Sequence, residues 1–286
     1  MANLLVVSKA GTVGKSTIAS ILIAPRFGCD EVITIETENA AGARYAQKVN
    51  RFTAERYLPY MEYVIHASDE GKNTVTDLGA SNYVNFLRNL ALANGIAFFD
   101  YVVVVTDTQE RSQQDAIDTI KQFFKLGMDP ERLRIVLNKS APAMPELTIE
   151  QQYETVFAAA RLDPRIKVNP ECNMPALPIF DQMAFNSISW AELLEDTTDY
   201  TARLKATVSE GQTMARAKTA AYRMAQASLK PTIMFSDLLF KALNIGPVVP
   251  APAFSTIKQG GAAATEESKN DASKHSSANK PSTVKA

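Results

Sequence analysis

A lysine and a serine near the start of the chain have the spacing of residues that hold nucleotide phosphates. Gly14-Lys15-Ser16 follows the apolar run Leu4-Leu-Val-Val7 and precedes a second apolar run. A glycine-bearing loop between a strand and a helix points backbone N–H groups at phosphate oxygens, and the helix N-terminus adds positive potential. In the pattern G-x-x-x-x-G-K-S/T the lysine reaches the β- and γ-phosphates and the hydroxyl binds Mg²⁺. We therefore predict a nucleoside triphosphate and Mg²⁺ at this loop.

The first half of the loop departs from that pattern, because its leading glycine position is occupied by Lys9. A strand at Asn3–Val7 and a helix over 17–23 nevertheless supply the required setting. The alternative is an ordinary strand–turn–helix, or a loop that has lost its nucleotide. The residues predicted to contact the phosphates are Lys9, Gly11, Thr12, Val13, Gly14, Lys15, Ser16 and Thr17.

Acidic residues follow two further strand-like runs. Glu36 and Glu38 stand at the end of Val-Ile-Thr-Ile-Glu, and Asp77 ends Val-Thr-Asp before Gly79. An Asp at a strand end, followed by a glycine-bearing loop, is how phosphoryl-transfer enzymes hold Mg²⁺ and sense the γ-phosphate. We predict that Ser16 and Asp77 bind the metal. Lys15 with Glu36 or Glu38 would be catalytic, a glutamate orienting the attacking water. A solvated strand end and a simple Asp turn are the alternatives.

Asn138 bears on the choice of base. A guanine-reading loop has the sequence Asn-Lys-x-Asp, whereas this chain reads Asn138-Lys139-Ser140-Ala141. Without the aspartate nothing holds the guanine amino group and N1–H. Asn138 alone is suited to the adenine edge, so we predict that the cofactor is ATP with Mg²⁺.

The elements that position these residues alternate between strand and helix. Tyr101-Val-Val-Val-Val-Thr106 has no polar alternation, which is typical of a strand buried on both faces. Alternation of this kind predicts an α/β fold, with a mostly parallel sheet flanked by helices and ligands at the carboxyl ends of the strands. The expected strands are 3–7, 32–36, 74–78, 101–106 and 134–138, with a weaker one near 177–180.

Composition excludes several other classes of function. The net charge is −1, so no general affinity for polyanions is indicated. Two cysteines give neither a disulfide framework nor a zinc spacing, and two histidines, His66 and His275, leave no Ser–His–Asp arrangement. No apolar run approaches the ~20 residues of a transmembrane helix, and no secretory signal opens the sequence. The expected location is the cytoplasm.

The character of the sequence changes after residue 185. We predict a nucleotide-binding domain over 1–185, a helical extension over 186–245 and a disordered tail over 246–286, since the tail has little apolar surface to bury. In the extension a helix is expected over 190–227, with a break at Pro231 and a short helix over 236–242.

The helical extension also carries a group of basic residues at helical spacing, Arg216, Lys218, Arg223 and Lys230. They suit weak, nonspecific contact with DNA phosphates or lipid head groups. An apolar stripe of Met214, Ala217, Ala221 and Met224 lies at similar spacing. The favoured interpretation is a packed amphipathic helix whose basic side faces solvent.

Together these motifs resemble the ParA/MinD family of P-loop ATPases. That family has the loop Lys-Gly-Gly-x-Gly-Lys-Ser/Thr, whose leading lysine reaches across a nucleotide-bound dimer. Aligned from Ser16, this chain has Ala10 in the position of that lysine, with Lys9 one residue away and Thr12 at the second glycine. Glu36-x-Glu38 resembles the family's Asp-x-Asp, and Asp77 resembles its switch aspartate.

A narrower likeness is to the StbB-like proteins of plasmid stability operons. It rests on Gly11-Thr-Val-Gly-Lys-Ser16, Leu22-Ile-Ala-Pro-Arg26 and Asp77-Leu-Gly-Ala-Ser-Asn82, and covers roughly residues 1–185. The resemblance implies a cytoplasmic, slowly hydrolysing ATPase switch in plasmid partition, stability or conjugative transfer. It also implies a nucleotide-dependent homodimer and a small DNA-binding partner. Two alternatives stay open: a non-hydrolysing adaptor that acts through protein contacts, and a metabolic ligase or kinase.

Overall fold

The computed structural model describes residues 1–29, 31–36, 48–141, 147–209 and 213–246. All of these lie within one compact unit. The predicted tail lies outside the described residues from position 247 onward, as does Glu38.

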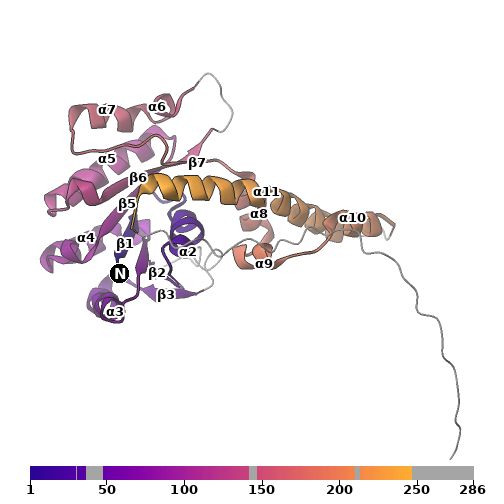
Figure 1. Ribbon diagram of the computed structural model, residues 1–286, viewed down its shortest axis with the longest axis horizontal. Coiled ribbons are helices and arrows are strands. Elements are labelled where there is room, and N and C mark those ends of the chain that lie inside the picture. The colour runs from indigo at the N-terminus through magenta and orange to yellow at the C-terminus, as the bar shows by residue number, and fades with distance from the viewer. Residues whose placement is uncertain (30, 37–47, 142–146, 210–212, 247–286) are drawn as a thin grey trace, which may run out of the picture. The chain divides into compact units, whose positions relative to one another are not determined.

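Seven parallel strands form a single sheet in the order β3-β2-β4-β1-β5-β6-β7 among the described residues (Figure 1). This confirms the predicted α/β fold class. The strands are β1 (Asn3–Val7), β2 (Val32–Ile35), β3 (Val49–Phe52), β4 (Thr74–Leu78), β5 (Tyr101–Thr106), β6 (Leu133–Ser140) and β7 (Asn173–Pro175).

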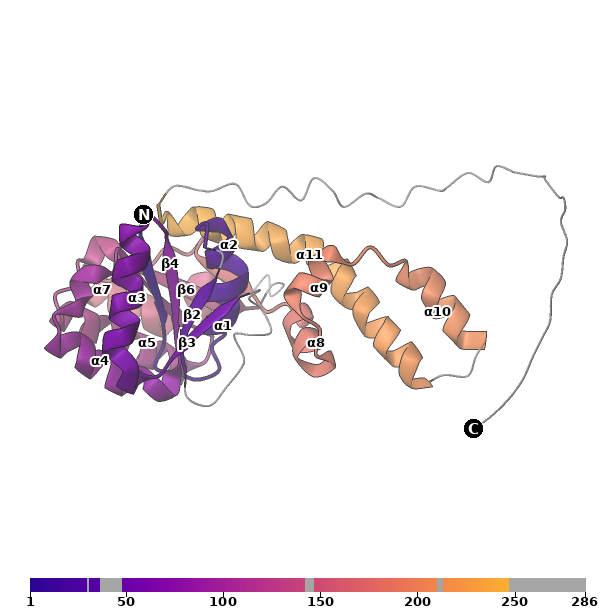
Figure 2. The same cartoon turned by 90° about the horizontal axis from the view of Figure 1, so that it is seen from below.

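Helices cover both faces of this sheet (Figure 2). On one face α3, α4, α5 and α7 close an apolar core, and on the other the helix after the phosphate loop and α11 close a second core. The helices are α1 (Lys15–Thr17), α2 (Ala24–Arg26), α3 (Tyr57–Asp69), α4 (Tyr83–Leu92), α5 (Glu110–Lys125), α6 (Ile149–Gln152), α7 (Glu154–Leu162), α8 (Pro178–Asn186), α9 (Trp190–Glu195), α10 (Tyr200–Ser209) and α11 (Thr213–Leu243). Among these described helices none is long and apolar enough to cross a membrane.

Two strand predictions need correction. The strand expected near 177–180 is wrong, because Pro178 begins α8 and proline is well suited to the first helical turn. The strand of that region is the earlier β7. β3 was not predicted, since Val-Asn-Arg-Phe is half exposed at the sheet edge and lacks the continuous apolar pattern of the central strands.

The helical extension also differs from expectation. The segment over 190–227 is divided among α9, α10 and the start of α11, and α11 continues through Pro231. Proline removes the donor for the carbonyl four residues earlier, that of Ala227. Both Pro231 and Ala227 are exposed, so water can replace that donor. The predicted break is therefore wrong.

The packed face of α11 is not the stripe that spacing suggested. Met214 is 84% exposed and Met224 is 51% exposed, while Ala221 alone of the four predicted residues is buried. The buried face instead contributes Ala225 and Leu229 to a cluster with α8 and α9. Leu239, Phe240 and Leu243 enter the core beneath the sheet. The division at residue 185 stays a prediction, but α11 is tied to the sheet by these contacts.

An arginine joins α11 to the helix that follows the phosphate loop. This helix runs from α1 through a π-helical segment, Ile18–Ile23, into α2. Pro25 has no N–H for the carbonyl of Ile21, and Arg26 Nη1 donates to that oxygen at 3.2 Å. The same guanidinium binds Asp237 Oδ1 of α11 at 2.5 Å. The string Ala24-Pro25-Arg26 thus ends one helix and anchors another.

Candidate functional site

The phosphate loop occupies residues 8–14 between β1 and α1. Gly14 has φ +86°, a left-handed conformation, and begins the helix as its N-cap. Lys15 is 5% exposed, and its Nζ donates to the carbonyl of Ala10 at 2.7 Å, so its side chain folds back over the loop. Burial lowers the pKa of Lys15, and the nearby carboxylates of Asp77 and Glu36 partly offset that effect. The loop therefore encloses a cation where a triphosphate would need one.

Asp77 lies on β4, between the strands β1 and β2. Its register partners are Val6 on one side and Thr34 on the other. The carboxyl is fully buried, and its Oδ1 has no hydrogen-bond partner. Burial raises the pKa of Asp77 to about 6; a hydrogen bond with Ser16 and the charge of Lys15 oppose the rise, while Glu36 adds to it. The sheet thus brings Asp77 together with Lys15 and Ser16.

This trio is suited to a magnesium ion bound with a nucleotide. Mg²⁺ prefers oxygen ligands, retains several waters and takes one or two protein oxygens beside the phosphates. The Ser16 hydroxyl and the unpartnered Asp77 oxygen supply such ligands. No group of three or more His, Cys, Asp or Glu side chains with metal-site geometry occurs among the described residues, so the phosphates would have to complete the coordination.

Glu36 contacts the loop that follows Asp77. Ser81 Oγ donates to Glu36 Oε1 at 3.3 Å, and Gly79 N donates to the carbonyl of Ile35 at 2.9 Å. A Cβ on Gly79 would lie 2.6 Å from Glu36 Oε2 and 2.9 Å from the backbone oxygen of Ile35, so a larger residue here would displace the Glu36 carboxylate and crowd β2. The carboxylate of Glu36 therefore sits against the segment 77–82. The water-orienting role of Glu36 and Glu38 stays a prediction.

Asn138 and Lys139, at the end of β6, hold the phosphate loop from the other side. Asn138 Nδ2 donates to the carbonyl of Val13 at 2.6 Å, and Lys139 Nζ donates to that of Thr12 at 2.6 Å. Lys139 has φ +61°, an uncommon conformation for a residue with a side chain. Sequence reasoning selected Asn138 for the adenine base and did not select Lys139. The adenine contact stays a prediction, while the amide nitrogen is bonded to the loop.

Replacing Gly14 with alanine is expected to lower the free energy of unfolding by more than its left-handed φ alone would cost. A Cβ at Gly14 would lie 2.4 Å from Asn138 Nδ2 and would break the bond to Val13. Gly127→Ala is the matched control, since its φ is +88° and nothing lies within 4 Å of its Cβ. We expect a loss of about 1 kcal/mol for the control and about 3 kcal/mol for Gly14→Ala, measured by urea unfolding. Equal losses would show that Asn138 does not constrain the loop.

The remaining predicted phosphate contacts differ in their surroundings. Lys9 pairs with Asp115 of α5, with Nζ and Oδ1 2.8 Å apart. That carboxylate raises the pKa of Lys9. Gly11 and Thr12 are exposed, whereas Val13 is buried in the core. Thr17 closes the first helical turn. Each assignment to phosphate binding stays a prediction.

No protein-family model matches the sequence, and no curated protein sequence matches it. Similar solved structures are ATPases of the ParA/MinD group. The ATP complex of a Cyanothece McdA variant is 12% identical, with a TM-score of 0.48 over 87% of this chain and 98% of that one. The MinC:MinD complex of Aquifex aeolicus is 14% identical, with a TM-score of 0.45 over 79% of this chain and 96% of that one. A ParA family ATPase of Chlorobium tepidum is 13% identical, with a TM-score of 0.41 over 86% and 98%. Likeness at this level does not by itself assign an activity.

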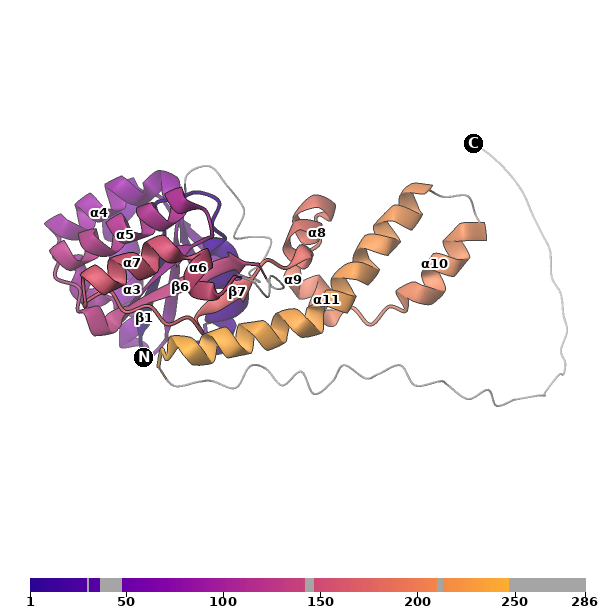
Figure 3. The same ribbon diagram turned by 90° about the horizontal axis from the view of Figure 1, so that it is seen from above.

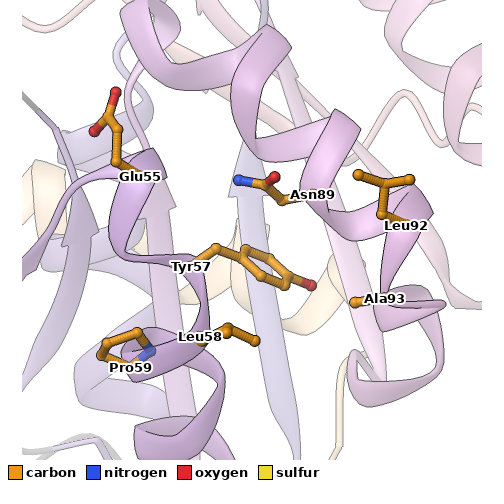
Figure 4. Close-up of a pocket in the computed structure, with 7 residues that line it drawn as sticks. All are labelled: Glu55, Tyr57, Leu58, Pro59, Asn89, Leu92 and Ala93. Atoms are coloured by element: carbon orange, nitrogen blue, oxygen red, sulfur yellow. The ribbon is translucent and has the colours of Figure 1, made fainter.

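The loop after Asp77 is hydrogen-bonded to a residue that lies next to a surface cavity. Asn82 Oδ1 accepts from Ala54 N at 3.3 Å, and Asn89 Nδ2 donates to Ala54 O at 2.9 Å. Just beyond Ala54 lies a cavity of about 440 Å³, where the ring of Tyr57 extends between α3 and α4 (Figure 4). Its lining is Glu55, Tyr57, Leu58, Pro59, Asn89, Leu92 and Ala93. Through Ala54, hydrogen bonds join Asn82 to Asn89 of α4, which lines this cavity.

Proposed function

We propose that this protein is an ATP-binding switch that hydrolyses ATP slowly. The observation that carries the proposal is the cluster of buried Lys15 and Asp77 with half-buried Ser16 at the carboxyl ends of β1 and β4, with one aspartate oxygen unpartnered. Such a cluster is costly for a protein to bury unless a ligand completes it. A triphosphate with Mg²⁺ would supply anionic oxygens for Lys15 and a cation for Asp77.

In this proposal the residues of the site divide among phosphate binding, metal binding and positioning of water. On binding, Lys15 Nζ exchanges the Ala10 carbonyl for phosphate oxygens, and the loop N–H groups from Gly11 to Lys15 take the remaining charge. Ser16 and Asp77 hold the metal, which when bound neutralises charge on the β- and γ-phosphates. Glu36 or Glu38 orients the attacking water. The segment 77–82 changes conformation according to whether the γ-phosphate is present, because it begins at Asp77 and contacts Glu36.

We further propose a cytoplasmic role in plasmid partition, stability or conjugative DNA transfer, beside a small DNA-binding protein. The sequence resemblance to StbB-like proteins supports this role, and the segments that carry it have structural tasks here. Arg26 anchors α11, and Asn82 joins the switch segment to Ala54. A nucleotide-dependent homodimer would let two copies enclose the exposed half of the loop.

One observation favours the non-hydrolysing adaptor as a second candidate. The lysine closest to the family's signature position, Lys9, is paired within its own chain to Asp115. To contact a nucleotide across a dimer, Lys9 would first have to leave this half-exposed ion pair. The protein would then respond to bound ATP without turning it over.

Sedimentation and single-turnover hydrolysis test these alternatives. We expect ATP with Mg²⁺ to convert the full-length chain from monomer to dimer, whereas ADP leaves it monomeric. Phosphate release in the presence of duplex DNA supports the switch. An ATP-bound dimer that releases no phosphate over hours supports the adaptor. Absence of ATP binding to the native chain would contradict both functions.

A further inference from the structure

On the outer face of α11, nonpolar residues recur at intervals of seven. One row holds Ala217, Met224, Pro231 and Leu238, and a second row three residues later holds Ala220, Ala227 and Met234. These seven residues are named here the outer seam. A pair of rows with this spacing is the pattern by which one helix packs against another. The core contacts of α11 use other residues, and within the outer seam Met224 Sδ accepts a weak hydrogen bond from Gln182 Nε2 of α8 at 3.8 Å.

The large side chains of the outer seam are half exposed. Met224, Met234 and Leu238 have 51, 52 and 57% of their surfaces accessible. At the end of the seam Leu238 borders a cavity of about 640 Å³ between α11 and the segment 169–173. Figure 3 shows α10 beside the N-terminal part of α11, which leaves the rest of the helix to α8, α9 and the sheet. An incoming side chain could occupy the cavity, and a helix that followed the whole seam would have to bend as α11 does midway along its length (Figure 3).

The charge beside the outer seam is strongly one-sided. Arg216, Arg223 and Lys230 form a third row with the same period, named here the basic edge. Asp237, the next member of that row, is bound to Arg26 and is the only acidic residue in α11. The basic edge therefore carries three positive charges. The acidic residue of α11, Asp237, is paired with Arg26 and does not neutralise them.

These features distinguish among possible occupants. A second copy of α11 packed antiparallel would place one basic edge against another, and like charges across a helix pair repel; packed parallel, it would offer no carboxylate to the basic edge. A lipid surface is usually met by bulky Leu, Phe or Trp residues, whereas this seam has three alanines and two methionines. Alanines allow two helices to approach closely, and methionine adapts to the partner's shape. Duplex DNA would use the cations but leave the apolar rows unused.

We propose that the outer seam and basic edge of α11 bind an acidic amphipathic helix of a partner protein. The helix lays its apolar stripe on the seam, and its Glu or Asp side chains pair with Arg223 and Lys230. The surface is built on a helix outside the phosphate site, so docking does not require ATP. The proposal therefore stands apart from the proposed switch, and the variant Lys15→Ala should bind the helix as the native chain does.

A charge exchange tests the pairing. The probe is a synthetic four-heptad helix with Leu and Ala in its apolar rows and Glu in the flanking rows, titrated against full-length protein. We expect saturable binding that weakens about 10- to 30-fold in the double variant Arg223→Glu/Lys230→Glu. A probe with Lys in place of Glu should prefer this variant. The control Lys121→Glu/Lys125→Glu makes the same change in net charge on exposed positions of α5 and should bind like the native chain.

A second variant separates apolar docking from general charge attraction. Met224→Lys/Met234→Lys adds two positive charges, so affinity for the acidic probe should rise if only charge matters and fall if the seam is used. Circular dichroism and thermal unfolding verify that each variant stays folded. The proposal is overturned if the native chain shows no saturable binding up to about 1 mM probe. It is also overturned if the methionine variant binds more tightly, or if the α11 charge variant loses only duplex DNA or anionic vesicles.

Discussion

Lys15→Ala is expected to weaken ATP binding by at least about 100-fold. The native ammonium group is nine-tenths buried beside Asp77 and donates to Ala10 O, a position from which it can turn to phosphate oxygens. Charge-assisted hydrogen bonds contribute about 1.5–3 kcal/mol each, and loss of two corresponds to at least about 100-fold in affinity. Isothermal titration calorimetry with Mg²⁺-ATP measures this change directly.

The fold should tolerate this substitution. Alanine removes a charge that burial disfavours, and the carbonyl of Ala10 lies on a partly exposed loop where water can donate to it. Circular dichroism should therefore match that of the native protein. Lys125→Ala, on the exposed side of α5, removes an equal charge far from the loop and should leave ATP affinity unchanged. Native-like affinity in Lys15→Ala would rule out the phosphate site as described.

Asp77→Asn is expected to stabilise the ligand-free protein at neutral pH while weakening its binding of Mg²⁺-ATP. Burial raises the pKa of Asp77 from 3.8 to about 6. A carboxyl whose folded pKa exceeds its unfolded value binds a proton on folding, so its contribution to stability is complete below about pH 4. The contribution is lost as the pH rises through about 6. This rise in the pKa corresponds to about 3 kcal/mol, which is the upper limit of the gain in unfolding free energy that Asp77→Asn can give above pH 7.

Chemical unfolding at several pH values measures this effect. The difference in unfolding free energy between Asp77→Asn and the native protein should be near zero at pH 4 and should grow through pH 6. Asp69→Asn, at an exposed position near the end of α3, should show no such trend. ATP titrations should show that the loss of affinity in Asp77→Asn depends on Mg²⁺. A difference in stability that stays constant from pH 4 to 8 would contradict a buried, titrating carboxyl.

The central part of the fold was predictable because its signals are local. β1 and β5 are largely apolar runs without polar alternation, which is typical of strands buried on both faces in parallel sheets. The edge strands gave weaker signals, since β3 is half exposed and β7 has three residues. Pro231 was misleading, because its effect depends on whether the carbonyl of Ala227 faces solvent, and only packing decides that.

The sequence by itself determined the residue types of the phosphate loop and the strand ends that carry Asp77 and Asn138. Glycine spacing and strand–helix alternation operate over a few residues, so they can be read directly. Tertiary structure alone decided which of these side chains meet. Asn138 reaches Val13 across 125 residues of sequence, and Arg26 reaches Asp237 across 211. Contacts of that range follow from the order of strands and the placement of α11, which arise from burying the whole apolar surface at once. For the same reason Lys9, adjacent to the loop in sequence, pairs with Asp115 instead.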